Sequence, residues 1–320
     1  MRFRIFISLS VILALLTLTS CKPETGENKK KVAVIVKSTY SDFWKEVEKG
    51  VNTAATEYNI DVTFEGPENE EDYVTQNDMI NRAVAKGVNA IVISAIDYVK
   101  SANALDAAAL AGVKILTIDS EVESESVSTF IGTDNLEAGK MAIEAAAKQF
   151  PPDSELRIGI LGCGNTSKNA TQRVEGIREF AASRGNAVII DEISVASNLQ
   201  SATAGAITML SSHSQINIII GVNEWMTLGI GNAIEKLGLS EKVCAVGFDS
   251  NVESIGKLET GEIDALIVQN PFAMGYLGVQ KATELIKGNT VESVISTKVT
   301  AILKENMFEE SNQKILFQFE

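Results

Sequence analysis

Polar and aromatic side chains follow several short apolar runs of this 320-residue chain. They include carboxylates, amides, hydroxyls, one arginine and two adjacent aromatic rings, but no histidine. Planar carboxylate, amide and guanidinium groups can bond neighbouring hydroxyls two at a time, and the apolar face of a sugar packs flat on an aromatic ring. The set therefore favours a neutral polyhydroxylated ligand. The candidate ligand-binding residues are Ser41, Asp42, Phe43, Trp44, Asp119, Ser120, Arg173, Asn223, Asp249 and Gln269.

Each candidate residue also has an ordinary structural explanation. An aspartate such as Asp119 or Asp249 commonly caps a helix or sits in a loop, and Phe43 and Trp44 would commonly be core residues. The functional signal is their joint placement at the ends of successive apolar runs.

Catalytic and metal-binding patterns are weak in this sequence. The one histidine, His213, lies in a polar turn and is expected at the surface. No group of cysteines and histidines has metal-site spacing. Residues 162–167 begin like a dinucleotide-binding loop but lack its third glycine. We therefore expect no catalytic residue, metal or cofactor, and predict a binding protein rather than an enzyme.

The elements that must position these residues alternate between strand and helix. Buried parallel strands are typically continuous apolar, β-branched runs, and helices show apolar residues three or four apart. The predicted strands are 31–36, 61–65, 90–94, 114–118, 128–132, 157–161, 187–193, 216–222, 242–248 and 264–269, with a final extended segment at 294–303. The predicted helices are 43–58, 71–86, 99–111, 137–149, 170–183, 201–211, 226–237, 254–259 and 272–287.

This alternation predicts an α/β fold of two doubly wound, Rossmann-like lobes with parallel sheets. About eleven strands are too many for one typical sheet of this kind. Ligands of open parallel sheets bind beyond the carboxyl ends of the strands, which is where the candidate residues stand.

The amino terminus has the layout of a secretory signal peptide. Arg2 and Arg4 precede an apolar stretch at 5–18 that is short for a transmembrane span. The sequence Leu18-Thr19-Ser20-Cys21 resembles the lipobox of bacterial lipoproteins, which implies lipidation of Cys21 after removal of residues 1–20. The alternative is an ordinary signal peptide with a chance cysteine. Residues 21–30 are polar and predict a flexible tether.

The net charge of the chain limits its possible binding partners. The chain carries a formal net charge of −14, and removing residues 1–20, which hold two arginines and no acid, lowers it to −16. An acidic surface disfavours contact with nucleic acid and with anionic membranes. Besides Cys21 there are two cysteines, Cys163 and Cys244, both in apolar runs, and we expect them to be buried free thiols.

A series of short motifs resembles one known family over residues 31–320. The motifs are Ser38-Thr39 followed by Phe43-Trp44, and the segments at 116–119, 132–135, 173–176, 222–224, 246–249 and 267–271. Together and in this order they resemble the ribose- and galactose-type periplasmic sugar-binding proteins, which have the type I solute-binding fold of ABC transporters. The resemblance implies three hinge crossings, near 133–134, 269–270 and 297–300. It also implies an N-terminal lobe of 31–133 plus 270–298 and a C-terminal lobe of 134–269 plus 299–320.

The resemblance implies roles for the candidate residues. Phe43 and Trp44 would stack on the sugar ring, Asp119 would bond its hydroxyls from the same lobe, and the second lobe would contribute Arg173, Asn223 and Asp249. Gln269 would touch the ligand from a hinge crossing. The sequence departs from ribose binders at Ser120, where an arginine is usual, and at 195–198, where no aromatic residue occurs. A roomier or less charged site for a hexose, a cyclic polyol or a modified sugar is thus as plausible as a ribose site.

The implied mechanism is hinged capture of the solute by an anchored, monomeric protein on the outer, periplasmic or cell-surface, face of the membrane. The closed form would deliver a neutral sugar or polyol to the permease and ATPase subunits of an ABC importer. An alternative output of the same fold is presentation of the ligand to a chemotaxis or signalling receptor. The secretion signal and the absence of a basic headpiece disfavour a DNA-binding repressor.

Overall fold

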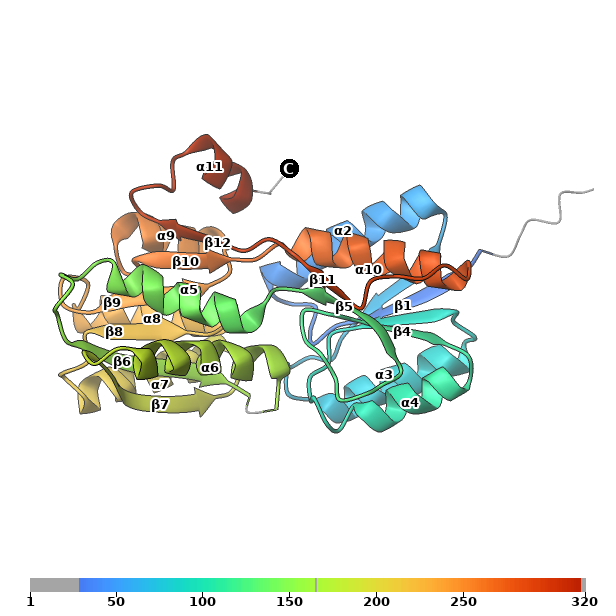
Figure 1. Ribbon diagram of the computed structural model, residues 1–320, viewed down its shortest axis with the longest axis horizontal. Coiled ribbons are helices and arrows are strands. Elements are labelled where there is room, and N and C mark those ends of the chain that lie inside the picture. Colours follow the sequence, from blue (N-terminus) through green and yellow to red (C-terminus); the bar gives the residue numbers. More distant parts are fainter. Residues whose placement is uncertain (1–28, 165, 318–320) are drawn as a thin grey trace, which may run out of the picture.

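Apolar, β-branched segments of the chain form two separate six-stranded sheets. The computed structural model describes residues 29–164 and 166–317, which form two α/β lobes lying side by side (Figure 1). The first sheet contains β1 (Lys31–Ile35), β2 (Asp61–Glu65), β3 (Ala90–Ile93), β4 (Lys114–Ile118), β5 (Val127–Gly132) and β11 (Val294–Ser296). The second contains β6 (Leu156–Cys163), β7 (Ala187–Val195), β8 (Ile218–Gly221), β9 (Cys244–Phe248), β10 (Ala265–Val268) and β12 (Thr300–Leu303).

The two sheets share one topology. Their orders are β11-β5-β4-β3-β1-β2 and β12-β10-β9-β8-β6-β7, so the first strand of each lobe lies between the second and the third. This is a doubly wound order, and its reversal point beside the first strand is where such sheets bind ligands. The predicted fold class of two doubly wound α/β lobes is confirmed.

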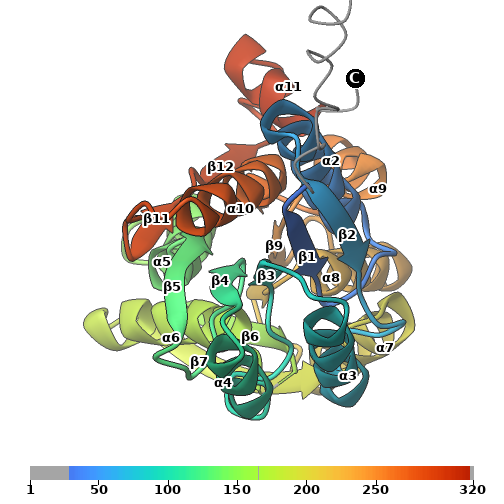
Figure 2. The same ribbon diagram turned by 90° about the vertical axis from the view of Figure 1, so that its right-hand side faces the viewer.

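Helices cover both faces of each sheet. The helices of the first lobe are α2 (Asp42–Tyr58), α3 (Tyr73–Ala85), α4 (Ala102–Leu110) and α10 (Pro271–Ile286). Figure 2 shows α2 and α10 on one side of this sheet and α3 and α4 on the other. The helices of the second lobe are α5 (Asn135–Ala147), α6 (Lys168–Ser183), α7 (Leu199–Ser212), α8 (Glu224–Leu237), α9 (Val252–Thr260) and α11 (Glu310–Leu316).

Alternate residues of β1 supply both layers of the first core. Val32 and Val34 pack with α2 and α10, whereas Ala33 and Ile35 pack with α3 and α4. A strand buried on both faces needs an apolar residue at every position, and β1 has one at each position after Lys31. This continuity accounts for the position of β1 inside the sheet, between β3 and β2.

Glycines let one pair of helices approach closely in each lobe. A Cβ at Gly275 of α10 would lie 2.1 Å from the carbonyl oxygen of Val47 in α2, and one at Gly50 would lie 2.1 Å from that of Phe272. In the second lobe, a Cβ at Gly139 of α5 or at Gly176 of α6 would lie at the same distance from a backbone carbonyl oxygen. The pairs α2·α10 and α5·α6 are therefore equivalent contacts of the two lobes.

Three segments carry the chain between the lobes. They follow β5, β10 and β11, as expected from the family resemblance. The hydroxyl of Thr133 donates to Oε1 of Gln269 over 2.8 Å, and the amide of Thr297 donates to the carbonyl of Gly132 over 2.7 Å. Side-chain and backbone hydrogen bonds thus tie the crossings to one another.

Two parts of the C-terminal region differ from the prediction. The extended segment at 294–303 is two strands, because it leaves the first sheet as β11 and enters the second as β12. β12 starts at the carboxyl ends of the second sheet and therefore runs antiparallel to β10, the exception to an otherwise parallel pairing. The short helix α11 was not predicted.

The two cysteines of the lobes are buried free thiols, as predicted. Burial raises the pKa of Cys163 to about 12 and that of Cys244 well above its ordinary value, so neither thiol is reactive at neutral pH. Cys21, the signal peptide and most of the predicted tether lie outside the described residues. In the described ranges no helix is both long and apolar enough to span a membrane.

Candidate functional site

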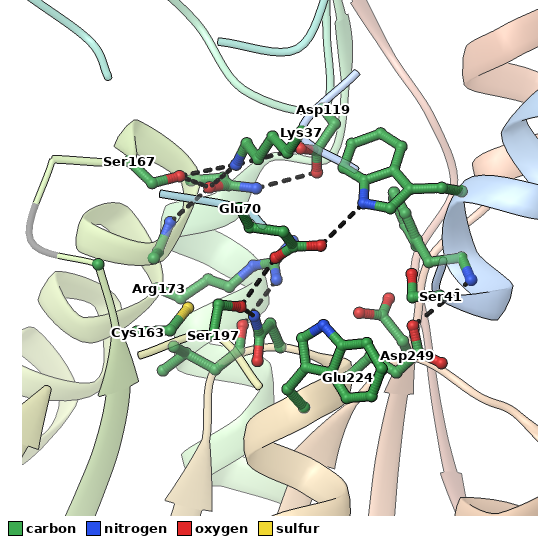
Figure 3. Close-up of a pocket in the computed structure, with 18 of the residues that line it drawn as sticks. Lys37, Ser41, Glu70, Asp119, Cys163, Ser167, Arg173, Ser197, Glu224 and Asp249 are labelled. Atoms are coloured by element: carbon green, nitrogen blue, oxygen red, sulfur yellow. Dashed lines mark hydrogen bonds and ion pairs between the residues drawn. The ribbon is translucent and has the colours of Figure 1, made fainter. Parts of the chain in front are cut away.

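A cavity lies between the lobes where the carboxyl ends of both sheets face each other (Figure 3). It encloses about 570 Å³, open solvent at its mouth included, which is in the usual range for small-molecule sites. The first lobe and hinge contribute Lys37, Ser41, Phe43, Trp44, Glu70, Glu71, Asp119 and Gln269. The second contributes Cys163, Gly164, Ser167, Asn169, Ala170, Arg173, Ser197, Val222, Asn223, Glu224, Trp225 and Asp249.

Aromatic rings enter the cavity from both lobes. Phe43 and Trp44 stand at the start of α2, with ring centroids 4.9 Å apart and ring planes nearly perpendicular at 89°. Trp225 of α8 packs against the second core and also lines the cavity. It supplies the second-lobe aromatic surface that residues 195–198 lack. Both tryptophans of the chain therefore line this site.

Two aspartates occupy equivalent positions of the two lobes. Asp119 directly follows β4 and Asp249 directly follows β9, the fourth strand of each doubly wound set. Both have left-handed backbone conformations, with φ of 58° and 68°. Non-glycine residues rarely adopt this conformation, and such strain concentrates at functional sites. Neither caps a helix; the cap of α9 is Asn251.

The two aspartates differ in their partners. Asp119 accepts hydrogen bonds from Ser94 Oγ at 2.8 Å and Asn169 Nδ2 at 2.9 Å, and Lys37 Nζ lies 3.4 Å away. Asp249 accepts from Gln269 Nε2 at 2.7 Å. Burial raises the pKa of Asp249 to about 7, although the charge of Arg173 acts in the opposite direction.

Arg173 presents an unused donor to the cavity. Its side chain is 1% exposed, and its guanidinium lies 4.3 Å above the ring of Phe248. Nε donates to Asn135 and Nη1 donates to the carbonyl of Val222, whereas Nη2 has no hydrogen-bond partner among the described residues. A buried donor without a partner is costly, so Nη2 is suited to bind a ligand oxygen.

Hydrogen bonds join the lobes across the cavity. Lys37 Nζ donates to Ser167 Oγ at 2.7 Å and Asn169 Oδ1 at 3.0 Å. Glu70 accepts from Trp44 Nε1 at 2.9 Å on one oxygen and from Ser197 Oγ of the second lobe at 2.8 Å on the other. The lobes are therefore in contact in this structure, and the site is closed around its polar groups.

Helix capping positions the remaining second-lobe groups. Asn223 is the N-cap of α8: its Oδ1 accepts from the Met226 amide, and its Nδ2 donates to Ser197 Oγ at 2.9 Å. The next residue, Glu224, accepts from Asn251 Nδ2 at 2.7 Å and hydrogen-bonds Ser41 of the first lobe. Burial raises the pKa of Glu224 as well.

The structure brings eight of the ten predicted ligand-binding residues into the cavity. Asp42 does not line it: its half-exposed side chain pairs with Lys45 at 2.8 Å and lines an adjacent cavity. Ser120 is fully buried behind the wall, and its hydroxyl has no hydrogen-bond partner among the described residues. The eight are Ser41, Phe43, Trp44, Asp119, Arg173, Asn223, Asp249 and Gln269.

Several polar lining residues were not predicted. Lys37 lies two residues after the end of β1, so the strand-end argument extends to it. Lys37 places a positive charge beside Asp119. The serine at position 120, where ribose binders usually have an arginine, had suggested a less charged site. Ser197 and Glu70 come from loops whose sequence carries no such signal. The described residues contain no group of three or more His, Cys, Asp or Glu that could hold a metal ion.

Comparison with known proteins agrees with this geometry. Residues 32–290 match the family described as the periplasmic binding protein domain, which is most of the chain. The chain belongs to the ribose/galactose-type periplasmic sugar-binding proteins.

Relatives and solved structures in this family match nearly end to end. The ribose import binding protein of Bacillus subtilis is 26% identical over 305 residues, covering 91% of this chain and 96% of its own. The D-ribose/D-allose-binding protein of Pseudomonas aeruginosa is 26% identical over 313 residues, covering 91% and 97%. A carbohydrate transporter solute-binding protein from Agrobacterium radiobacter, solved with D-arabinose, has a TM-score of 0.87 at 27% identity, covering 91% and 99%.

Proposed function

We propose that this sugar-binding protein is the extracytoplasmic, lipid-anchored component of an ABC importer. It captures a monosaccharide or sugar-like polyol in the interlobe cavity by hinged closure and delivers it to a permease. The two lobes that close on the ligand are the N-terminal lobe, residues 31–133 with 270–298, and the C-terminal lobe, residues 134–269 with 299–320. The acyl groups on Cys21 would hold the protein at the outer face of the membrane, since stable anchoring takes more than one chain.

One observation supports this function above the others: the cavity combines aromatic faces with fixed bidentate polar groups from both lobes. Phe43 and Trp225 offer aromatic rings. The two aspartates with left-handed backbone conformations offer acceptors, and Arg173 Nη2 offers a donor. A ligand that bonds both lobes binds the closed form better than the open form, and this difference in affinity drives closure. Sugars bound in related solved structures, such as D-arabinose and D-fucose, are consistent with this ligand class.

Tryptophan fluorescence provides the test, because Trp44 and Trp225 both line the cavity. The full-length chain in mild detergent would be titrated with pentoses, hexoses and cyclic polyols. We expect at least one compound to change the emission saturably, and Arg173→Ala to weaken that binding about tenfold or more, since charged hydrogen bonds contribute about 1.5–3 kcal/mol.

The matched control is Asp42→Ala, which removes a carboxylate adjacent to the site but outside the cavity. It should bind like the parent protein. Equal loss of affinity in Asp42→Ala and Arg173→Ala, or no binding of any compound, would contradict the proposed site.

A further inference from the structure

The cavity contains more negative charge than its cations can balance. Among the described residues, five carboxylates line it but only two cationic side chains, Lys37 and Arg173. Lys37 pairs with Asp119 at 3.4 Å, and the charge of Arg173 acts on Asp249. Neither Lys37 nor Arg173 forms an ion pair with the three glutamates of the lining, which are Glu70, Glu71 and Glu224.

Glu70 is the glutamate that reaches the middle of the cavity (Figure 3). It projects from the loop between β2 and α3, and both of its oxygens are held by neutral donors, Trp44 Nε1 and Ser197 Oγ. No lysine, arginine or histidine in the described part of the chain forms an ion pair with Glu70. Burial raises its pKa, and the more distant charge of Lys37 offsets this only in part. A partly buried carboxylate without a cation is costly, and a cationic ligand group would remove that cost.

The approach to Glu70 is also acidic. A second cavity of about 510 Å³, open solvent included, adjoins the first and shares Glu70, Glu71, Ser197 and Trp225 with it. Its lining, as far as the structure describes the chain, includes three glutamates, with Glu68 the third, and no basic residue. An acidic cleft raises the local concentration of cations and speeds their entry.

Other lining groups already meet the needs of hydroxyls. Asp119 and Asp249 offer acceptors from the two lobes, and Arg173 Nη2 is a buried donor of the cavity that has no partner in the described part of the chain. These groups suffice to orient a polyhydroxylated ring, so Glu70 adds a charge that a neutral sugar does not require. Each carboxylate oxygen of Glu70 keeps a further lone pair for an N–H donor, and an ammonium offers three such donors.

We propose that the ligand is a sugar or polyol bearing a protonated amino group, whose ammonium binds Glu70 while its hydroxyls bind Asp119, Asp249 and Arg173. This inference rests on the proposed function and specifies the class of its ligand. A charge-assisted bond between ammonium and carboxylate is about twice as strong as a neutral one, so the amino group would dominate selectivity.

The test compares matched pairs of sugars by tryptophan fluorescence on the full-length chain in detergent. Hexoses with an amino group at carbon 2, 3 or 6 would each be titrated beside the neutral parent and the N-acetylated derivative. In at least one set the amino sugar should bind about tenfold or more tightly than both uncharged compounds. Glu70→Gln should abolish this preference, whereas Glu70→Asp, which keeps the charge, should retain part of it.

Glu68→Gln is the charge-matched control, because Glu68 is exposed on the same loop and lines only the outer cavity. It should keep the preference. If neutral parents bind as tightly as amino sugars in every set, or if Glu70→Gln keeps the preference, the inference is overturned while the proposed function stands. Binding of none of the compounds would overturn both.

Discussion

Asp119 and Asp249 share one backbone conformation, and each places a carboxylate in its half of the site. Each follows the fourth strand of its lobe with φ in the left-handed region, so the two carboxylates enter the cavity from equivalent positions. Asparagine and aspartate tolerate this conformation better than most residues. Asparagine substitutions therefore test the charge of these positions without straining the backbone.

The raised pKa of Asp249 makes stability depend on pH. Its pKa is about 7 in the folded state and about 4 in the unfolded chain, so the folded state holds an extra proton between these values. Stability should therefore fall as pH rises from 4 to 7, with this residue contributing up to about 4 kcal/mol. Asp249→Asn should flatten that slope in urea unfolding of the ligand-free protein measured from pH 4 to 8.

Asp42→Asn is the control for this titration, since Asp42 is half-exposed and outside the cavity. It should keep the slope of the parent protein. A parallel pH profile for Asp249→Asn and the parent would show that Asp249 does not titrate in this window.

Sequence predicts the site best where a strand end marks it. Asn223 and Asp249 closely follow β8 and β9, and the structure brings them together. Arg173 lies within α6 and was predicted from the family resemblance. Glu70 lies in a loop with several other acidic residues that resembles a solvated segment, and only the packing of the lobes turns its side chain inward. Ser120 follows a strand end too, but its side chain is fully buried and does not line the cavity.

At the scale of elements, the paired glycines set how closely helices pack. Gly275→Ala would place a methyl 2.1 Å from the carbonyl oxygen of Val47, so α10 must move away from α2. Overpacking of this kind typically costs about 1–3 kcal/mol. We expect a lower urea midpoint with an unchanged slope.

Gly256→Ala is the matched control inside α9, where an added Cβ meets nothing within 4 Å. Alanine has the higher helix propensity, so this variant should gain up to about 1 kcal/mol. If Gly275→Ala were as stable as Gly256→Ala, the close approach of α2 and α10 would be refuted.

Most elements were predictable because buried parallel strands are continuous apolar runs. Predicted and observed bounds of β1 to β10 agree to within about two residues, as for β2 and β4, which coincide. The break between β11 and β12 has no local signal, because it results from the third crossing between sheets. α11 is only seven residues long, and Leu316 is buried by tertiary contacts rather than by a periodic pattern.

At the scale of the whole molecule, ligand-driven closure should be visible in solution scattering. A saturating ligand identified by fluorescence should reduce the radius of gyration, because contacts to both lobes favour the closed form. Arg173→Ala at the same ligand concentration should remain expanded. Identical scattering with and without saturating ligand would contradict hinged capture.

Lipidation of Cys21 should decide where the protein resides. Cys21→Ser removes the thiol that would carry the lipid and should shift the protein from the membrane fraction to the soluble fraction of expressing cells. Cys244→Ala alters a buried thiol instead and should leave the protein with the membranes. Retention of Cys21→Ser in the membrane fraction would refute the anchor.

The place of α10 in the first lobe has a consequence for biosynthesis. Met274, Val279 and Ala282 of α10 complete the core against Val47 and Val51 of α2, yet the entire second sheet except β12 lies between them in sequence. A chain that emerges from its amino end can thus assemble β6 to β10 before the earlier half has its last layer. The first lobe therefore stays incomplete until α10 has been made, and the apolar side of α2 is the surface that a chaperone would need to shield during export.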